Sequence, residues 1–341
     1  MTKIPVILGP TAVGKTEVSL LLAERMGGEI ISADAFQVYR GMDIGTAKPA
    51  PAELSRIPHH LINILNLKEQ YSAAWFRSLA LDLIEDIRSR KSVPMVVGGS
   101  GLYIKALTDG LFDAPPSDQK YRDFLRQEEA AKGAGYLHGL LLRQDPVSAE
   151  RIHPNNLKRV IRALEVLELT GVPISRWQRQ WRGKKDEHST FNVQRSTFKE
   201  PESSPPPPVD RPPPTAHCPL PTPYLLIGLR RDREDLYNRI NRRVVKMFDH
   251  GLVEETEELL KKGLMKNRVA RQALGYREVQ GYLTGEYDRV EAIKLLSTKT
   301  RHFAKRQLTW WRADDRIEWI DLAEDDRAED AADKIMSKML Q

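Results

Sequence analysis

The fold of this chain is decided by one stretch of sequence, Gly9-Pro10-Thr11-Ala12-Val13-Gly14-Lys15-Thr16. The stretch fits the pattern G-x-x-x-x-G-K-[ST] of a phosphate-binding loop. It directly follows a short apolar segment, Ile4 to Leu8, and directly precedes a segment of helical periodicity, Thr16 to Met26. In such a loop the glycines allow close wrapping around an anion, which backbone N–H groups and the helix N-terminus face. We therefore predict that residues 9–16 bind phosphate groups, with Lys15 as a positive charge and Thr16 as a hydroxyl ligand for Mg²⁺.

Apolar segments and an amphipathic helix alternate after this loop. Further strands are predicted at residues 29–33, 60–64 and 93–97, and a helix is predicted at residues 72–88. Such alternation of strands and helices is typical of a parallel sheet covered by helices. The first part of the chain therefore predicts an α/β fold.

The character of the sequence changes near Pro115. Two charged amphipathic helices are predicted at residues 117–132 and 157–170, with no strand between them. Residues 182–223 are polar and rich in proline, and such a segment cannot bury enough apolar surface to offset its ordering entropy. Strands are then predicted at residues 224–229 and 317–320, and helices at residues 233–250, 253–262 and 291–312.

These segments predict a P-loop NTPase-like parallel sheet flanked by helices, with an all-helical insertion. The expected parts are residues 1–115 (first part of the catalytic core), 116–181 (helical insertion), 182–223 (disordered linker) and 224–341 (second part of the core, with basic C-terminal helices).

Composition restricts the class of protein only weakly. The formal net charge of +6 is compatible with a polyanionic partner but is shared by many enzymes. A single cysteine, Cys218, excludes a disulfide framework within the chain and a cysteine-based metal site. Because no apolar run approaches the roughly 20 residues that cross a bilayer, we expect no membrane association and a cytoplasmic location.

Asp34 is the second candidate for chemistry. It follows the predicted strand 29–33, so in a parallel sheet it lies at the carboxyl edge near the phosphate loop. It could act as an Mg²⁺ ligand, as a general base, or as a structural cap. The strand 93–97 ends in Gly98-Gly99-Ser100-Gly101 and not in an acid, which argues against a P-loop kinase or GTPase.

Four longer motifs resemble the tRNA dimethylallyltransferase family. They are Ser32-Ala33-Asp34-Ala35-Phe36-Gln37-Val38-Tyr39-Arg40-Gly41-Met42-Asp43-Ile44-Gly45-Thr46-Ala47-Lys48-Pro49, Val97-Gly98-Gly99-Ser100-Gly101-Leu102-Tyr103, Arg151-Ile152-His153-Pro154-Asn155-Asn156, and Thr300-Arg301 with Lys305-Arg306-Gln307-Leu308-Thr309-Trp310. With the phosphate loop they stand in the family's order from residue 4 to about residue 320. The chain ends without the Cys or His pairs of the zinc finger that eukaryotic members often carry, so it is similar to the bacterial type.

The resemblance implies transfer of a dimethylallyl group from its diphosphate to N6 of the adenosine 3′-adjacent to the anticodon. The leaving diphosphate needs positive clamps, which the resemblance places at residues 9–16, with Mg²⁺ on Thr16, and at Arg233. The implied general base is Asp34, and Ser100 would donate a hydrogen bond to the bridging oxygen of the leaving group. The implied catalytic residues are Asp34, Ser100, Lys15 and Arg233. Two residues depart from the family's usual pattern, because Ala35 replaces Ser and Ser100 replaces Thr.

Basic residues cluster along several predicted helices. Such clusters are typical of solvated helical faces when taken singly, but together they indicate a surface for an RNA stem-loop. The target base must leave the anticodon stack to reach Asp34. The predicted tRNA-binding residues, from these clusters and from the resemblance, are Asp34, Ala35, Phe36, Gln37, Ser100, Asp118, Lys158, Arg159, Arg162, Gln272, Gly275, Tyr276, Arg277, Lys305, Arg306 and Arg312.

Three other functions remain open at this point. A related enzyme could prenylate a free adenine nucleotide, although the helical insertion suggests a larger acceptor. A P-loop small-molecule kinase lacks support because no acid follows residues 93–97. A non-catalytic RNA-binding module leaves Asp34 beside the phosphate loop unexplained. The expected partners are the tRNA anticodon stem-loop and dimethylallyl diphosphate, the expected cofactor is Mg²⁺, and the expected state is a monomer.

Overall fold

The computed structural model describes residues 3–111, 115, 117–180 and 223–339. The chain divides into two compact units, of which one comprises Met1–Thr108 and Pro214–Gln341 and the other comprises Asp109–Pro213. Except for Pro223, the predicted linker at residues 182–223 lies outside the described residues. We refer to the first unit as the core unit and to the second as the helical unit.

Six strands of the core unit form one parallel sheet in the order β3-β2-β4-β1-β5-β6 within the described residues. The strands are β1 (Ile4–Leu8), β2 (Gly28–Ala33), β3 (His59–His60), β4 (Val93–Gly98), β5 (Tyr224–Arg231) and β6 (Glu318–Leu322). Every residue of β1 and β2 is buried, as expected for strands covered on both faces. The predicted parallel α/β sheet is therefore confirmed.

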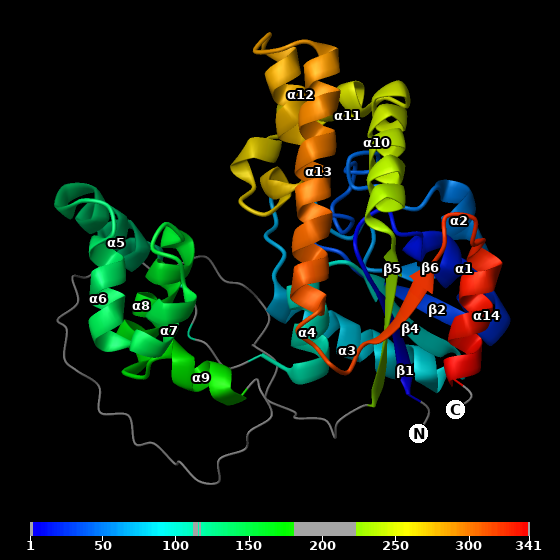
Figure 1. The fold of residues 1–341 in the computed structure, drawn as a ribbon, viewed down its shortest axis with the longest axis horizontal. Helices are drawn as coiled ribbons and strands as arrows, with labels where there is room; N and C mark the ends of the chain where they lie inside the picture. Colours follow the sequence, from blue (N-terminus) through cyan, green and yellow to red (C-terminus); the bar gives the residue numbers. More distant parts are fainter. Residues whose placement is uncertain (1–2, 112–114, 116, 181–222, 340–341) are drawn as a thin grey trace. The chain divides into compact units, whose positions relative to one another are not determined.

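Helices of the core unit cover the sheet and extend beyond it (Figure 1). They are α1 (Lys15–Met26), α2 (Pro51–Arg56), α3 (Ala73–Ser89), α4 (Gly101–Asp109), α10 (Arg233–Asp249), α11 (Leu252–Lys261), α12 (Tyr276–Leu283), α13 (Arg289–Trp311) and α14 (Ala328–Met339), with short 3-10 turns η1 (Leu264–Lys266) and η2 (Ala270–Gln272). Figure 1 shows α10 to α13 gathered beyond the carboxyl ends of the strands, whereas α1 and α14 pack side by side. Helices that are distant in sequence from β1 and β2 therefore border the carboxyl edge of the sheet.

The helical unit has a core of its own. Its elements are α5 (Gln119–Lys132), α6 (Tyr136–Gln144), α7 (Pro146–Arg151), α8 (Leu157–Thr170) and α9 (Ile174–Gln180). Apolar side chains of α5, α6 and α8, such as Leu125, Leu141 and Leu164, form a separate buried cluster. All described secondary structure in this unit is helical, as predicted for the insertion.

Most predicted elements lie within a few residues of the observed ones, but one strand is wrong. Residues 60–64 were expected to be extended, whereas β3 contains only His59 and His60. The backbone of Leu61 and Asn63 has positive φ angles, 63° and 57°, which are incompatible with a continuing strand. The helices α2, α4, α6, α7, α9, α12 and α14 were not predicted from the sequence.

Candidate active site

The phosphate loop joins β1 to α1, as the motif predicts. Gly9 has φ +148° and Gly14 has φ +108°, which disfavour any residue with a side chain. A β-carbon on Gly9 would also lie 2.6 Å from the carbonyl oxygen of Leu229 on β5. The two glycines thus permit both the curvature of the loop and its close approach to the neighbouring strand.

Lys15 is folded back over this loop. Its Nζ donates hydrogen bonds to the carbonyl oxygens of Gly9 at 3.0 Å and Pro10 at 2.8 Å. Burial and, to a smaller extent, the positive charge of Arg243 lower the pKa of Lys15 to about 7, although the charge of Asp34 opposes this shift. A bound phosphate would favour the charged form of Lys15, because it would place negative charge beside the ammonium group.

Two arginines of α10 lie against the same loop. Arg239 donates from Nε to the carbonyl oxygen of Ala12 at 3.0 Å, and Arg243 donates to the hydroxyl of Thr11. Burial lowers the pKa of Arg243 to about 10, still high enough for a charged guanidinium at neutral pH. The sequence analysis did not predict that these arginines contact the phosphate loop. Their spacing on one helical face is the signal that could have indicated it.

The structure does not bring the predicted clamp Arg233 to this place. Arg233 is exposed at the start of α10, and its guanidinium lies 5.2 Å from the ring centre of Tyr237. Among the described residues that line the cavity beside the loop, α10 contributes Arg239, Arg242, Arg243 and Lys246, but not Arg233. We therefore assign the positively charged side of the cavity to the middle of α10 and not to Arg233, the first residue of this helix.

Asp34 follows β2 at the carboxyl edge of the sheet, as predicted. Its Oδ1 accepts hydrogen bonds from the backbone N–H groups of Phe36 at 2.8 Å and Gln37 at 3.2 Å. Burial raises the pKa of Asp34, while the two N–H groups and the charges of Lys15 and Lys48 lower it. Within the described part of the chain, Oδ2 accepts no hydrogen bond, so this oxygen is available to a substrate proton.

Ser100 lies at the end of the adjacent strand. Its backbone N–H donates to the carbonyl oxygen of Ala33 at 3.3 Å, which places Ser100 beside the residue that precedes Asp34. Its neighbours Gly98 and Gly99 line the cavity. The two predicted catalytic residues Asp34 and Ser100 are thus brought to adjacent strand ends.

The side-chain amide of Gln37 is fixed by three contacts. Its Oε1 accepts from the Ser32 hydroxyl at 3.1 Å, and its Nε2 donates to the carbonyl oxygens of Thr46 and Ala47, both at 3.3 Å. Gln37 lines the cavity, and the neighbouring Ala35 and Phe36 pack against the core. The amide of Gln37 therefore has a defined orientation before any substrate binds.

One cavity of about 490 Å³ connects these groups. Such a volume lies in the range of small-molecule sites. Its lining includes Thr11, Lys15 and Thr16 on the phosphate side and Asp34 and Gln37 on the other side. The phosphate loop and the predicted base thus face a common space.

A further contact joins the loop to the β4–α4 turn. Gln307 of α13 accepts from the backbone N–H of Thr11 and donates to the carbonyl oxygen of Gly99, both at 2.9 Å. Gln307 lies in a motif that the sequence analysis singled out, but the sequence assigned it no role. Its side chain holds the turn before Ser100 at a fixed distance from the phosphate loop.

The other predicted tRNA contacts of the core unit fall into two groups. Gln272, Arg277, Lys305, Arg306 and Arg312 are exposed, as a contact with RNA requires. Gly275 and Tyr276 are buried, and the hydroxyl of Tyr276 donates to Glu255 at 2.9 Å. The structure therefore places Tyr276 in the interior, which corrects the expectation that its side chain lines an RNA path.

The predicted residues of the helical unit also differ from one another. Lys158 and Arg159 are exposed at the start of α8. Arg162 instead pairs with the buried Glu165 and donates to the carbonyl oxygen of Pro115 at 3.0 Å. The Asp118 carboxylate caps α5 by accepting from the N–H of Tyr121 at 3.0 Å. Arg162 and Asp118 thus have structural partners, whereas no ion pair of Lys158 or Arg159 is present among the described residues.

The described residues contain neither a membrane span nor a ready metal cluster. No described helix is long and apolar enough to cross a bilayer. No group of three or more His, Cys, Asp or Glu side chains is placed to hold a metal ion in the described parts of the chain.

Comparison with known proteins gives consistent matches over nearly the whole chain. A family model described as IPP transferase matches residues 37–314. The tRNA dimethylallyltransferase of Geobacillus thermodenitrificans is 45% identical over 326 residues, which cover 95% of this chain and 92% of that protein. The tRNA dimethylallyltransferase of Carboxydothermus hydrogenoformans is 42% identical over 339 residues, which cover 99% of this chain and 96% of that protein.

Solved structures show the same similarity. The tRNA isopentenylpyrophosphate transferase of Bacillus halodurans matches with a TM-score of 0.65 and 37% identity, covering 100% of this chain and 97% of that chain. A eukaryotic dimethylallyltransferase, described as acting on tRNA, matches with a TM-score of 0.73 and 24% identity, covering 99% of this chain and 80% of that chain. At that identity the second match supports the fold alone.

Proposed function

The chain belongs to the IPP transferase family, and we propose that it transfers a dimethylallyl group from dimethylallyl diphosphate to N6 of the adenosine 3′-adjacent to the anticodon in tRNA. The observation that carries this proposal is the single cavity shared by the phosphate loop and Asp34. In one step the C1–O bond to diphosphate breaks and the N6–C1 bond forms. The diphosphate leaves with the electron pair of the broken bond, and a proton leaves N6.

The donor side of the cavity would hold the diphosphate. Negative charge builds up on the leaving group as the C1–O bond breaks, so cations and N–H groups placed beforehand lower the barrier. Lys15, Arg239 and Arg243 lie on or against the loop and supply this positive charge. We propose the two arginines in the clamping role that the sequence analysis gave to Arg233.

The residues present fit a magnesium ion. Thr16 lines the cavity directly after Lys15, and Mg²⁺ commonly takes one or two protein oxygens together with substrate phosphates and water. The Thr16 hydroxyl would therefore hold Mg²⁺, which when bound would neutralise charge on the diphosphate.

Asp34 would accept the proton from the adenine amine. This amine is a weak nucleophile because its lone pair is delocalised into the ring, so a positioned base contributes to the rate. Two backbone N–H groups orient the carboxylate through Oδ1, which leaves Oδ2 for the substrate. Burial raises the pKa of Asp34 and thereby makes the ionised carboxylate a stronger base.

Gln37 would contact the adenine after it leaves the anticodon stack. Enzymes that act on a base must take it out of the stack, and they read it by hydrogen bonds in a pocket. The amide of Gln37 lines the same cavity as Asp34 and is oriented by Ser32, Thr46 and Ala47. The exposed Lys305, Arg306 and Arg312 of the core unit could bind the RNA backbone.

The direct test is a reaction of the purified protein with Mg²⁺, dimethylallyl diphosphate and an unmodified anticodon stem-loop. We expect prenylated adenosine 3′ to the anticodon, measured by mass spectrometry of the nucleosides, and an equimolar release of diphosphate. A stem-loop with guanosine at this position is the control and should give no product. Prenylation of AMP without prenylation of RNA would favour a free-nucleotide acceptor, and ATP hydrolysis without prenyl transfer would favour a kinase.

A further inference from the structure

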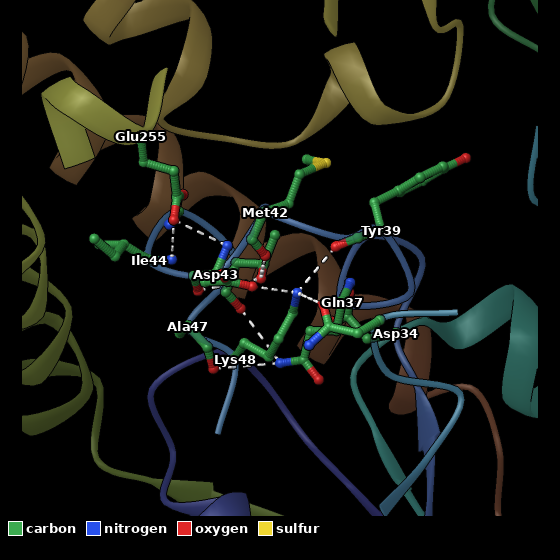
Figure 2. A network of polar contacts seen from close by, with 12 residues as sticks. Asp34, Gln37, Tyr39, Met42, Asp43, Ile44, Ala47, Lys48 and Glu255 are labelled. Atoms are coloured by element: carbon green, nitrogen blue, oxygen red, sulfur yellow. Dashed lines mark hydrogen bonds and ion pairs between the residues drawn. The ribbon is translucent and has the colours of Figure 1, made fainter. Parts of the chain in front are cut away.

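Glu255 on α11 binds a backbone turn more than 200 residues away in the sequence. Its Oε2 accepts from the N–H groups of Asp43 at 3.0 Å and Ile44 at 2.7 Å, and its Oε1 accepts from the N–H of Gly45 at 3.0 Å. Figure 2 shows this carboxylate above the turn. Successive N–H groups in a turn form a concave site for an anion, and here a carboxylate of the chain itself fills it.

The turn at residues 43–45 leads directly to the two carbonyl groups that orient Gln37. The amide of Gln37 donates to the carbonyl oxygens of Thr46 and Ala47, the residues that follow the turn. Ala47 has φ +50°, a conformation that a residue with a side chain rarely adopts without support. The position of these carbonyls therefore depends on contacts that hold the turn.

Lys48 stabilises the same stretch of backbone, residues 34–48, from its C-terminal end. Its side chain is only 2% exposed, and its Nζ donates to the carbonyl oxygen of Tyr39 at 2.9 Å, to Asp43 Oδ1 at 2.5 Å and to Asn63 Oδ1 at 2.6 Å. Burial lowers the pKa of Lys48, whereas Asp43, Glu255 and Asp34 raise it. Lys48 and Glu255 thus hold the two sides of one segment, residues 34–48 (Figure 2).

We propose that Glu255 is a positioning residue for the acceptor base, acting through the turn 43–45 and the side chain of Gln37. Glu255 does not line the cavity, so its effect on the substrate would pass through the turn that it holds. The inference rests on the proposed function, because it requires that Gln37 contacts the adenine. It also gives the buried Tyr276 a role, since its hydroxyl donates to Glu255 and helps to orient the carboxylate.

The variant Glu255→Gln tests the inference with almost no change of volume. An amide has one acceptor oxygen, so its NH₂ group must face at least one of the three N–H donors of the turn. We expect kcat/KM for tRNA to fall about tenfold, the size of a lost hydrogen bond to a charged group. The Kd of dimethylallyl diphosphate should stay within about twofold, because the phosphate loop and Glu255 share no hydrogen-bond partner within the described part of the chain. The matched control is Glu257→Gln, an exposed residue of the same helix.

The background Gln37→Ala separates a positioning role from a merely structural one. If Glu255 acts through Gln37, adding Glu255→Gln to Gln37→Ala should lower kcat/KM for tRNA by less than about twofold. An undiminished tenfold loss in that background, or an equal loss of dimethylallyl diphosphate binding, would overturn the inference. Wild-type activity on tRNA is measured first: its absence refutes the proposed function, whereas an active wild type with an equally active Glu255→Gln refutes only the role of Glu255.

Discussion

Two loops meet at the cavity, and they are held in different ways. The phosphate loop, residues 9–16, follows β1 and takes its shape from its own glycines and from the strand beside it. The acceptor segment, residues 34–48, follows β2 and is held by the side chains of Glu255, Lys48 and Asn63. Consecutive residues predict the shape of the first loop, which Arg239, Arg243 and Gln307 also contact. The second loop depends on side chains that only the tertiary structure brings to it.

The difference between the phosphate loop and the acceptor segment matches the part of the substrate that each would bind. A diphosphate presents the same charged oxygens in every substrate, and backbone N–H groups with a few cations suffice to bind it. An extruded base is recognised by the direction of single hydrogen bonds, which require a side chain in a fixed orientation. Substitutions on the two sides should therefore affect different steps of the reaction.

The largest effect is expected for Asp34→Asn. The amide oxygen can still accept from the N–H groups of Phe36 and Gln37, so the turn should persist, but the base is lost. We expect the single-turnover rate of prenyl transfer to fall about a thousandfold, within the range for general bases. Binding of dimethylallyl diphosphate should be unchanged, and a loss of that binding would show that Asp34 belongs to the donor side instead.

The next effect, on the donor side, is expected for Lys15→Ala. The ammonium group is buried beside the loop, where a diphosphate oxygen would replace the carbonyls of Gly9 and Pro10. Removing one partner of a buried charge pair should raise the Kd of dimethylallyl diphosphate about a hundredfold, measured by titration calorimetry. The affinity for tRNA without the donor is the internal control and should not change. A loss of both affinities would remove the distinction between the two sides.

The sequence specified the donor side well because its information is local. The motif at residues 9–16 stands between a strand and a helix, and the same chain order in a parallel sheet also predicts that Asp34 of the acceptor segment lies at this edge. Arg233, which the resemblance suggested as a clamp, is exposed at the start of α10 and does not line the cavity. Arg239 and Arg243 reach the loop instead, because they lie on one face of α10.

The acceptor side could be predicted only in part. Gln37 was identified by resemblance, but its orientation depends on Glu255 and on a turn with positive φ at Ala47. No local pattern pairs residue 255 with residues 43–45, because that contact arises from the packing of α11 in the tertiary structure. For the same reason Tyr276, expected at the surface, lies in the interior as a partner of Glu255.

The pH dependence of kcat/KM for tRNA should test the role of Asp34 on the acceptor side. Asp34 must be ionised to accept a proton, and burial raises its pKa above the ordinary value of 3.8. As the pH falls through this raised pKa, the protonated fraction grows, so kcat/KM for tRNA should fall about tenfold per pH unit. This acidic limb should lie at a higher pH than for an unshifted aspartate. The residual activity of Asp34→Asn should lack it, and a profile that is the same in both proteins would contradict the assignment.

The smallest effect is expected for Gly45→Ala, which strains the acceptor side without removing a polar group. The added β-carbon would lie 2.6 Å from Cζ of Tyr276, so the turn or the Tyr276 ring, whose hydroxyl donates to Glu255, must shift. Overpacking of this kind costs about 1–3 kcal/mol of unfolding free energy, which a denaturant titration measures. Because the three hydrogen bonds to Glu255 are bent and not lost, kcat/KM for tRNA should fall by less than the loss expected for Glu255→Gln. The control is Gly139→Ala on α6, where an added β-carbon meets no atom within 4 Å. Unchanged tRNA kinetics in a destabilised Gly45→Ala protein would show that the turn supports the fold but not the acceptor site.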